Sequence, residues 1–210
     1  MRVILTALVL LMGVVGVAKA QEAYVPGVHY QVLEKPVATS DPDKIEVVEA
    51  FWYGCGHCYR FEPVLQQWKK TLAEDVNFVQ MPAVWNQPMS LHAKAFYTAE
   101  ALGKLDEMHQ ALFNAMNIER KRFSSEGEIA EFFAQFGVSE EDFLKKFRSF
   151  QVDSKVRESQ AKARGYGLQG TPEVFVDGKY RVSTSMAGSQ ENMLTVAAFL
   201  VDKIRLEKGK

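Results

Sequence analysis

The pattern of hydrophobic and polar residues changes its period several times along the chain. Residues 45–53 form an apolar, aromatic run that is typical of a buried strand, and the run breaks at Gly54. Helical spacing follows over residues 55–72, and residues 76–82 then alternate as a strand does. The first part of the chain therefore predicts a strand, a helix and a second strand.

The middle of the chain has a different character. Residues 89–164 are helical in pattern almost throughout, with Ser124 or Ser125 and Ser139 as helix caps. Strand signals return at residues 173–176 and 179–182, on either side of Asp177-Gly178, which is typical of a two-residue hairpin turn. The order of elements is thus strand-helix-strand, a helical block, and then two strands.

A final amphipathic helix is expected over residues 189–207, whereas residues 21–44 are rich in turn formers and predict at most a short edge strand. This order indicates an α/β protein, a thioredoxin-like fold with an inserted helical domain. We expect the thioredoxin-like domain to comprise residues 21–85 and 153–210, with the helical insertion at residues 86–152.

The N-terminus is typical of a secretory signal peptide, predicted over residues 1–20. Arg2 precedes an apolar run at residues 3–17, and Ala18-Lys19-Ala20 offers a cleavage site after Ala20. The run is shorter than the roughly 20 residues of a membrane-spanning helix, although an uncleaved anchor is the alternative. Export would place the protein in an oxidising compartment, where cysteines can cycle through a disulfide.

The charge composition gives no sign of a nucleic-acid partner. The chain has 25 Lys and Arg residues against 26 Asp and Glu residues, a formal net charge of −1, and the basic residues are scattered. We therefore expect no nucleic acid to bind. The sequence also predicts no cofactor and no metal.

Cys55 and Cys58 are the only two cysteines of the chain and form a C-x-x-C motif. The motif lies where the first strand turns into a helix, so Cys55 falls at the first helical turn. Free backbone N–H groups and the positive end of the helix dipole stabilise a thiolate there. A C-x-x-C motif in this position, with His57 between the sulfurs, indicates a redox-active dithiol.

Two structural interpretations fit the motif less well. A disulfide that closes a ring of only four residues would contribute roughly 2 kcal/mol as a staple, less than a bridge between distant cysteines. A zinc site would need two further ligands at a similar spacing. The histidines outside the motif lack that spacing, and they are His29, His92 and His109.

The residues around the motif carry a family resemblance. Residues 48–62, which contain the C-x-x-C motif, and residues 170–180, which contain Thr-Pro-Glu, resemble the DsbA family of periplasmic thiol–disulfide oxidoreductases. Two features depart from the best-known members. Gly56-His57 replaces Pro-His and is the pair familiar from protein disulfide isomerase, and Thr171 replaces Val, as in disulfide isomerases of the DsbC kind.

The resemblance implies roles for the motif itself. Cys55 would form the mixed disulfide with substrate, and the more buried Cys58 would resolve it or receive the attack. His57 would lend positive charge or a hydrogen bond to the Cys55 thiolate. The alternative is that His57 is an ordinary polar residue in a helix turn.

The resemblance also implies roles for residues outside the motif. A cis peptide bond between Thr171 and Pro172 would lie opposite the sulfurs and leave the Thr171 backbone free to pair with an extended substrate; the alternative is an ordinary trans turn. Glu49 resembles the family's buried acid, which has a raised pKa and relays a proton; a partly solvated side chain is the alternative. Glu62 is a weaker candidate for this role.

The function implied is that of an enzyme, a monomeric periplasmic disulfide oxidase. It would donate its disulfide to reduced exported proteins and be reoxidised by a membrane partner of the DsbB kind. A disulfide isomerase or reductase is the closest competing function, although DsbC-like isomerases carry an N-terminal dimerisation domain and only residues 21–44 precede the first core strand here. A non-catalytic function is also open, either as a metal carrier that uses Cys55, His57 and Cys58 or as a holdase.

Overall fold

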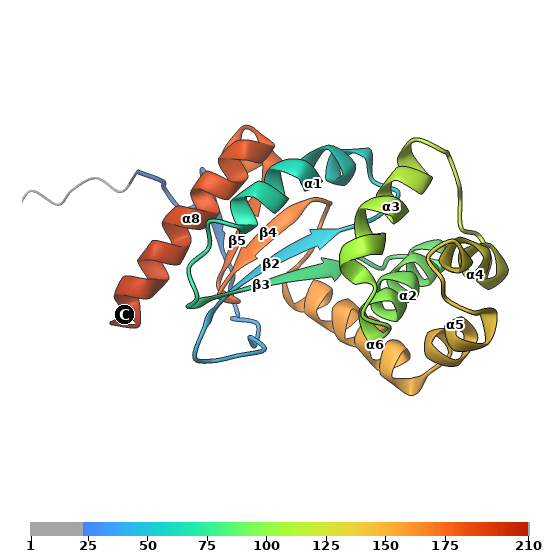
Figure 1. The fold of residues 1–210 in the computed structure, drawn as a ribbon. Coiled ribbons are helices and arrows are strands. Elements are labelled where there is room, and N and C mark those ends of the chain that lie inside the picture. Colours follow the sequence, from blue (N-terminus) through green and yellow to red (C-terminus); the bar gives the residue numbers. More distant parts are fainter. Residues whose placement is uncertain (1–22, 210) are drawn as a thin grey trace, which may run out of the picture.

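The computed structural model describes residues 23–209, so the expected signal peptide and its cleavage site lie outside the described residues. The described part contains a five-stranded sheet and helices on both of its faces (Figure 1). The strands are β1 (Gln31–Val32), β2 (Ile45–Phe51), β3 (Val76–Pro82), β4 (Glu173–Val176) and β5 (Tyr180–Ser183). The helices are α1 (Gly56–Lys69), α2 (Gln87–Ala101), α3 (Leu105–Asn117), α4 (Glu126–Ala134), α5 (Glu140–Phe147), α6 (Phe150–Gly165), α7 (Thr184–Ala187) and α8 (Gln190–Glu207).

The sheet has the order β1-β5-β4-β2-β3, which places β2 between two neighbours. β2 runs parallel to β3 and antiparallel to β4, and every residue of β2 is buried. A strand buried on both faces needs an almost continuous apolar run, which is what the sequence pattern indicated. The run is interrupted in β2 by two acids, of which Glu49 is paired in register with Gln80 on β3.

The two faces of the sheet are covered by different helices. Val47 faces a core cluster with residues of α1 and α8, whereas Val48 and Ala50 face a second cluster with Ala163 of α6. Alternate residues of a strand point to opposite faces, which explains the division. The arrangement confirms the predicted thioredoxin-like fold with helices inserted between β3 and β4.

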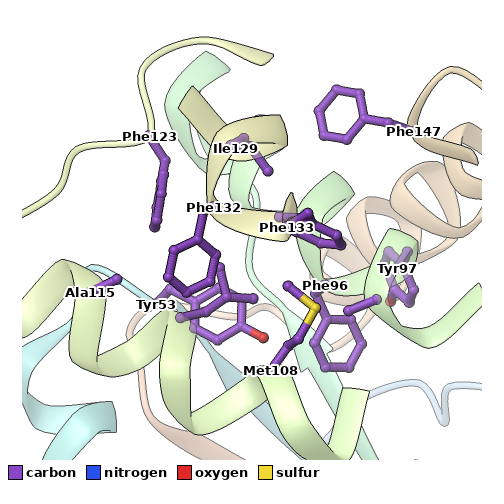
Figure 2. Close-up of a cluster of buried hydrophobic side chains, with 14 of the residues drawn as sticks. Tyr53, Phe96, Tyr97, Met108, Ala115, Phe123, Ile129, Phe132, Phe133 and Phe147 are labelled. Carbon is purple, nitrogen blue, oxygen red and sulfur yellow. The ribbon is translucent and has the colours of Figure 1, made fainter. Parts of the chain in front are cut away.

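The helical block α2–α6 lies at one end of the sheet (Figure 1). Its core includes Phe96, Met108 and Phe132, and Tyr53 from the end of β2 lies among them (Figure 2). Asn117 at the end of α3 donates from Nδ2 to the Tyr53 carbonyl oxygen, at 2.8 Å. The helical block therefore holds the chain two residues before Cys55.

The expected end of the insertion at residue 152 falls inside α6. Val152 and Val156 lie in the core cluster of the helical block, whereas Ala163, further along the same helix, lies in the cluster against the sheet. One continuous helix thus belongs to both parts. The sequence pattern did not reveal this division because the helical spacing is unbroken across the boundary.

Candidate active site

Cys55 caps the N-terminus of α1. Its backbone is extended, with φ −89° and ψ 110°, and its sulfur accepts a hydrogen bond from the backbone N–H of Cys58 at 3.4 Å. The helix starts here because Gly54 and the preceding turn reverse the chain, with the Cys55 N–H donating to the Trp52 carbonyl oxygen at 2.9 Å. The predicted position at the first helical turn is confirmed.

The two sulfurs have opposite surroundings. Cys55 is partly exposed and Cys58 is fully buried, and both are free thiols in this structure. The pKa of Cys55 falls to about 5, chiefly because the Cys58 thiol donates a hydrogen bond to it. Burial opposes this fall, and hydrogen bonds from the Thr171 side chain and from the backbone N–H groups of Cys58 and His57 add to it. Burial instead raises the pKa of Cys58 far above its ordinary value.

The His57 side chain does not approach the sulfur in the way the sequence predicted. Its Nδ1 lies 3.0 Å from Nη2 of Arg60 on the exposed side of α1, and its carbonyl oxygen accepts a hydrogen bond from Gln190 at 2.8 Å. The group of His57 that lowers the pKa of Cys55 is the backbone N–H. The imidazole points away because the helix turn directs side chains at position 57 towards solvent.

Thr171 and Pro172 lie beside Cys55. The peptide bond between them is cis, as predicted, and the Cys55 thiol donates to the Thr171 carbonyl oxygen at 3.3 Å. Thr171 and Pro172 also line an open groove, to which Ser183 contributes. The full lining is His57, Gly170, Thr171, Pro172, Glu173, Ser183, Thr184 and Ser185.

Glu49 is fully buried, which excludes the partly solvated alternative. Oε2 accepts a hydrogen bond from Gln80 Nε2 at 3.0 Å, and Oε1 has no hydrogen-bond partner among the described residues. Burial raises the pKa of Glu49 well above its ordinary value, and the nearby charge of Glu62 raises it further. Its surroundings therefore favour the protonated form of this carboxyl group, close to the cysteine pair.

Comparisons with known proteins agree with this geometry. Residues 46–197 match the DSBA-like thioredoxin domain family. The chain belongs to the DsbA family. The predicted fold and membership of this oxidoreductase family are thus confirmed.

Similar proteins cover almost the whole chain. Thiol:disulfide interchange protein DsbA of Pseudomonas aeruginosa is 38% identical over 99% of this chain and 98% of its own length. Thiol:disulfide interchange protein DsbA of Pseudomonas syringae is 41% identical over 90% of this chain and 88% of its own length. The crystal structure of Pseudomonas aeruginosa DsbA has a TM-score of 0.85 at 39% identity and covers 89% of this chain and 97% of its own. The crystal structure of oxidoreductase DsbA from Xylella fastidiosa has a TM-score of 0.82 at 30% identity and covers 87% of this chain and 98% of its own.

Glu62 lies beside Glu49 in the same buried region, and the helical block supplies its partner. His109 Nε2 of α3 is 3.3 Å from Glu62 Oε1, and Gln80 Nε2 is 3.3 Å from Glu62 Oε2. Burial acts to raise the pKa of Glu62, but the hydrogen bond and charge of His109, together with hydrogen bonds from Gln66 and Gln80, outweigh burial, and the net pKa is lowered. The sequence analysis considered His109 only as a zinc ligand and did not predict this role.

Glu173 and Arg181 form a second buried pair, which the sequence did not single out. Arg181 donates from Nε and Nη2 to the two Glu173 oxygens at 2.9 and 2.5 Å, and the backbone N–H groups of Gln169 and Gly170 also reach this carboxylate. The pair therefore ties β5 to the loop that carries Thr171. The only indication of this pair in the sequence was that Glu173 and Arg181 have opposite charges and lie diagonally across the predicted hairpin.

Within residues 23–209, no group of three or more His, Cys, Asp or Glu side chains is placed to hold a metal ion. None of the helices in that same range combines the length and the apolar character that crossing a membrane requires.

Proposed function

We propose that the protein oxidises pairs of thiols in exported proteins by passing on a disulfide between Cys55 and Cys58. The observation that carries the proposal is the contrast between the two sulfurs, one partly exposed with a pKa of about 5, the other buried with a raised pKa. A stabilised Cys55 thiolate favours the reduced protein, so the disulfide form is a good oxidant.

The reaction proceeds by two exchanges. A substrate thiolate attacks Sγ of Cys55 in the disulfide, the bond between the two protein sulfurs breaks, and Cys58 leaves as a thiolate. A second substrate thiol, once deprotonated, attacks the substrate sulfur of the mixed disulfide and releases Cys55 as a thiolate. The substrate loses two electrons and the cysteine pair gains them.

Glu49 supplies the proton for the buried leaving group. The raised pKa of Cys58 means that its thiolate takes up a proton as soon as it forms. Glu49 is buried nearby and favours its protonated form, because burial and the Glu62 charge raise its pKa. Transfer from Glu49 leaves a Cys58 thiol and a Glu49 carboxylate, which regains a proton from solvent later.

Thr171, Pro172 and His57 bind and orient the substrate chain. All three line one open groove, and the Thr171 carbonyl oxygen faces the Cys55 sulfur. An extended peptide in this groove places its own sulfur opposite Cys55. The exposed His57 imidazole contacts the substrate at the rim of the groove.

The protein acts as a monomer in the periplasm after removal of residues 1–20, and a membrane partner of the DsbB kind restores its disulfide. The sequence supports this through the signal pattern and the family resemblance. An intact-mass measurement on exported protein should correspond to a chain that starts at Gln21. A mass that retains Met1 to Ala20 would contradict cleavage.

Disulfide isomerisation is the second candidate, favoured by Gly56-His57 and by Thr171. Two assays separate the functions: oxidation of a reduced peptide with two cysteines, and refolding of a protein with scrambled disulfides. We expect fast oxidation of the peptide and slow refolding of the scrambled protein. Cys55→Ser should be inactive in both assays. Fast rescue with poor peptide oxidation would reverse the assignment. A redox titration against glutathione then measures how oxidising the pair is.

A further inference from the structure

His109 is a buried polar residue in an aromatic core. The residue is 6% exposed, and its ring meets the edges or faces of Phe51, Phe96 and Phe113 at centroid distances of 5.2, 5.9 and 5.1 Å. Both ring nitrogens nevertheless have polar partners. Nδ1 lies 2.8 Å from the hydroxyl oxygen of Tyr53, and Nε2 faces Glu62.

The hydrogen atoms around Gln80 indicate which atom of His109 carries a proton. The Gln80 amide nitrogen has two hydrogens and lies 3.0 Å from Glu49 Oε2, 3.3 Å from Glu62 Oε2 and 3.0 Å from His109 Nε2. The two amide hydrogens satisfy the two carboxyl groups. His109 Nε2 then carries its own hydrogen and donates it to the other oxygen of Glu62, Oε1, which also accepts a hydrogen bond from Gln66 Nε2 at 2.6 Å.

We propose that His109, from the helical block, is a positioning residue for disulfide exchange: it holds Glu62 as a carboxylate, so that the proton shared by the two buried acids stays on Glu49. The proposal rests on the proton-donating role of Glu49 proposed above. It gives the helical block a part in the chemistry, in addition to covering one end of the sheet.

The charges around the two acids agree with this assignment. Glu62 has a lowered pKa through His109, and its charge is a cause of the raised pKa of Glu49. Cys55 is the other charged group that acts on Glu49, and it also acts to raise the pKa. Tyr53, on the far side of His109, stays neutral because burial and the two acids raise its pKa. Gln66 and Gln80 also donate to Glu62 and lower its pKa, but His109 is the one of these donors that can also bring a positive charge to Glu62.

The order of events then follows from this separation. When Cys58 leaves as a thiolate, the neutral acid is the one near the sulfurs, so a proton is available without a rearrangement. If Glu62 held the proton instead, Glu49 would be a carboxylate facing a new thiolate. Two like charges in a buried site repel each other, so the departure of Cys58 would slow.

The experiment measures the titration of Glu62 in the reduced full-length mature protein by carbon-13 NMR of labelled glutamate side chains. His109→Leu removes the donor, and we expect the Glu62 midpoint to rise by at least about one pH unit, a tenfold change in proton affinity. His109→Gln retains a neutral N–H donor and should restore part of the shift. His92→Leu is the matched control, since His92 is also a buried histidine of the helical block but contacts Trp52 and the Arg122 carbonyl oxygen.

An unchanged Glu62 midpoint in His109→Leu would overturn the proposal, as would an equal shift in the His92→Leu control. If His109→Leu does not fold, nitrogen-15 NMR of the wild-type protein decides instead: a hydrogen on Nε2 is expected, and an Nε2 without one excludes the donation to Glu62. The pH profile of peptide oxidation in Glu49→Gln tests the proposed function separately. A profile identical to the wild type would reject the role of Glu49 while leaving the link between His109 and Glu62 intact.

Discussion

The Cys55 thiol and the Thr171 carbonyl oxygen lie 3.3 Å apart although 116 positions separate them in the sequence. That interval contains α1, β3 and the whole helical block. The two parts of the thioredoxin-like domain on either side of the block therefore meet at the reacting sulfur. This contact explains why the environment of Cys55 depends on the whole domain and not on the C-x-x-C motif alone.

The first prediction concerns the hydrogen bond between the two thiols. Cys58→Ser keeps a donor to Cys55, so the rate of Cys55 alkylation against pH should give a midpoint near the pKa of about 5. Cys58→Ala removes the largest cause of the lowered pKa, so its midpoint should be higher. Midpoints near 8.5 in both variants, roughly the value of a free cysteine, would contradict the mechanism.

Thr171→Val should leave the fold intact and raise the pKa of Cys55. The substitution removes a side-chain hydrogen bond that lowers this pKa but preserves the shape of the residue. The lifetime of mixed disulfides with a substrate peptide should change as well, because Thr171 lies beside the sulfur. Thr195→Val, on the exposed face of α8, is the control and should have no effect on either measurement.

Glu49→Gln should change how the stability of the reduced protein depends on pH. The folded pKa of Glu49 is raised, so the folded state keeps its proton above the unfolded pKa of about 4.3, whereas the unfolded chain loses it. The contribution of Glu49 to the free energy of unfolding is fully present below that pH. It decreases as the pH rises towards the raised pKa, by at most about 1.4 kcal/mol per pH unit. Urea unfolding between about pH 5 and 7 should show a flatter profile for Glu49→Gln. The exposed Glu158→Gln should follow the wild type.

Arg181→Met should destabilise the protein strongly. It leaves the buried Glu173 carboxyl group without its cation, and breaking a buried ion pair in this way costs about 3–5 kcal/mol. Arg205→Met is the matched control, because the Arg205–Asp75 pair has the same chemistry but is more exposed. A cost within about 1 kcal/mol is expected there. Equal losses in urea unfolding would contradict the importance of the buried pair.

Gly54→Ala should also destabilise the protein. A Cβ at position 54 would lie 2.4 Å from the Trp52 ring, far inside van der Waals contact, and the ring is held by its bond to His92. Gly127→Ala is the control, since its Cβ would have room inside α4 and should stabilise by about 0.5–1 kcal/mol. Thermal unfolding of the two variants should therefore shift in opposite directions.

The local features of this protein could be predicted from its sequence. β3 occupies residues 76–82 as predicted, and Asp177 and Gly178 have the two positive φ angles, 50° and 65°, that their residue types favour. The two-residue turn was wrong by one position, because Val176 pairs with Tyr180 and β5 covers Tyr180–Ser183 instead of residues 179–182. Ser125 and Ser139 cap the helices that they were expected to cap. Cys55 lies at a helix N-terminus because the strand, the glycine and the helix are contiguous. Each of these features depends on the conformational preferences of neighbouring residues, which the order of residues records directly.

Only the tertiary structure decided how distant side chains pair. It buried Glu49 completely, joined His109 of α3 to Glu62 of α1, and turned the His57 imidazole towards Arg60. It also made α6 part of both the helical block and the sheet layer. These relationships depend on which helix faces pack together and on how many donors and acceptors meet in the space left between them. The hydrophobic period indicates that a face is buried, but it does not indicate which other face covers it.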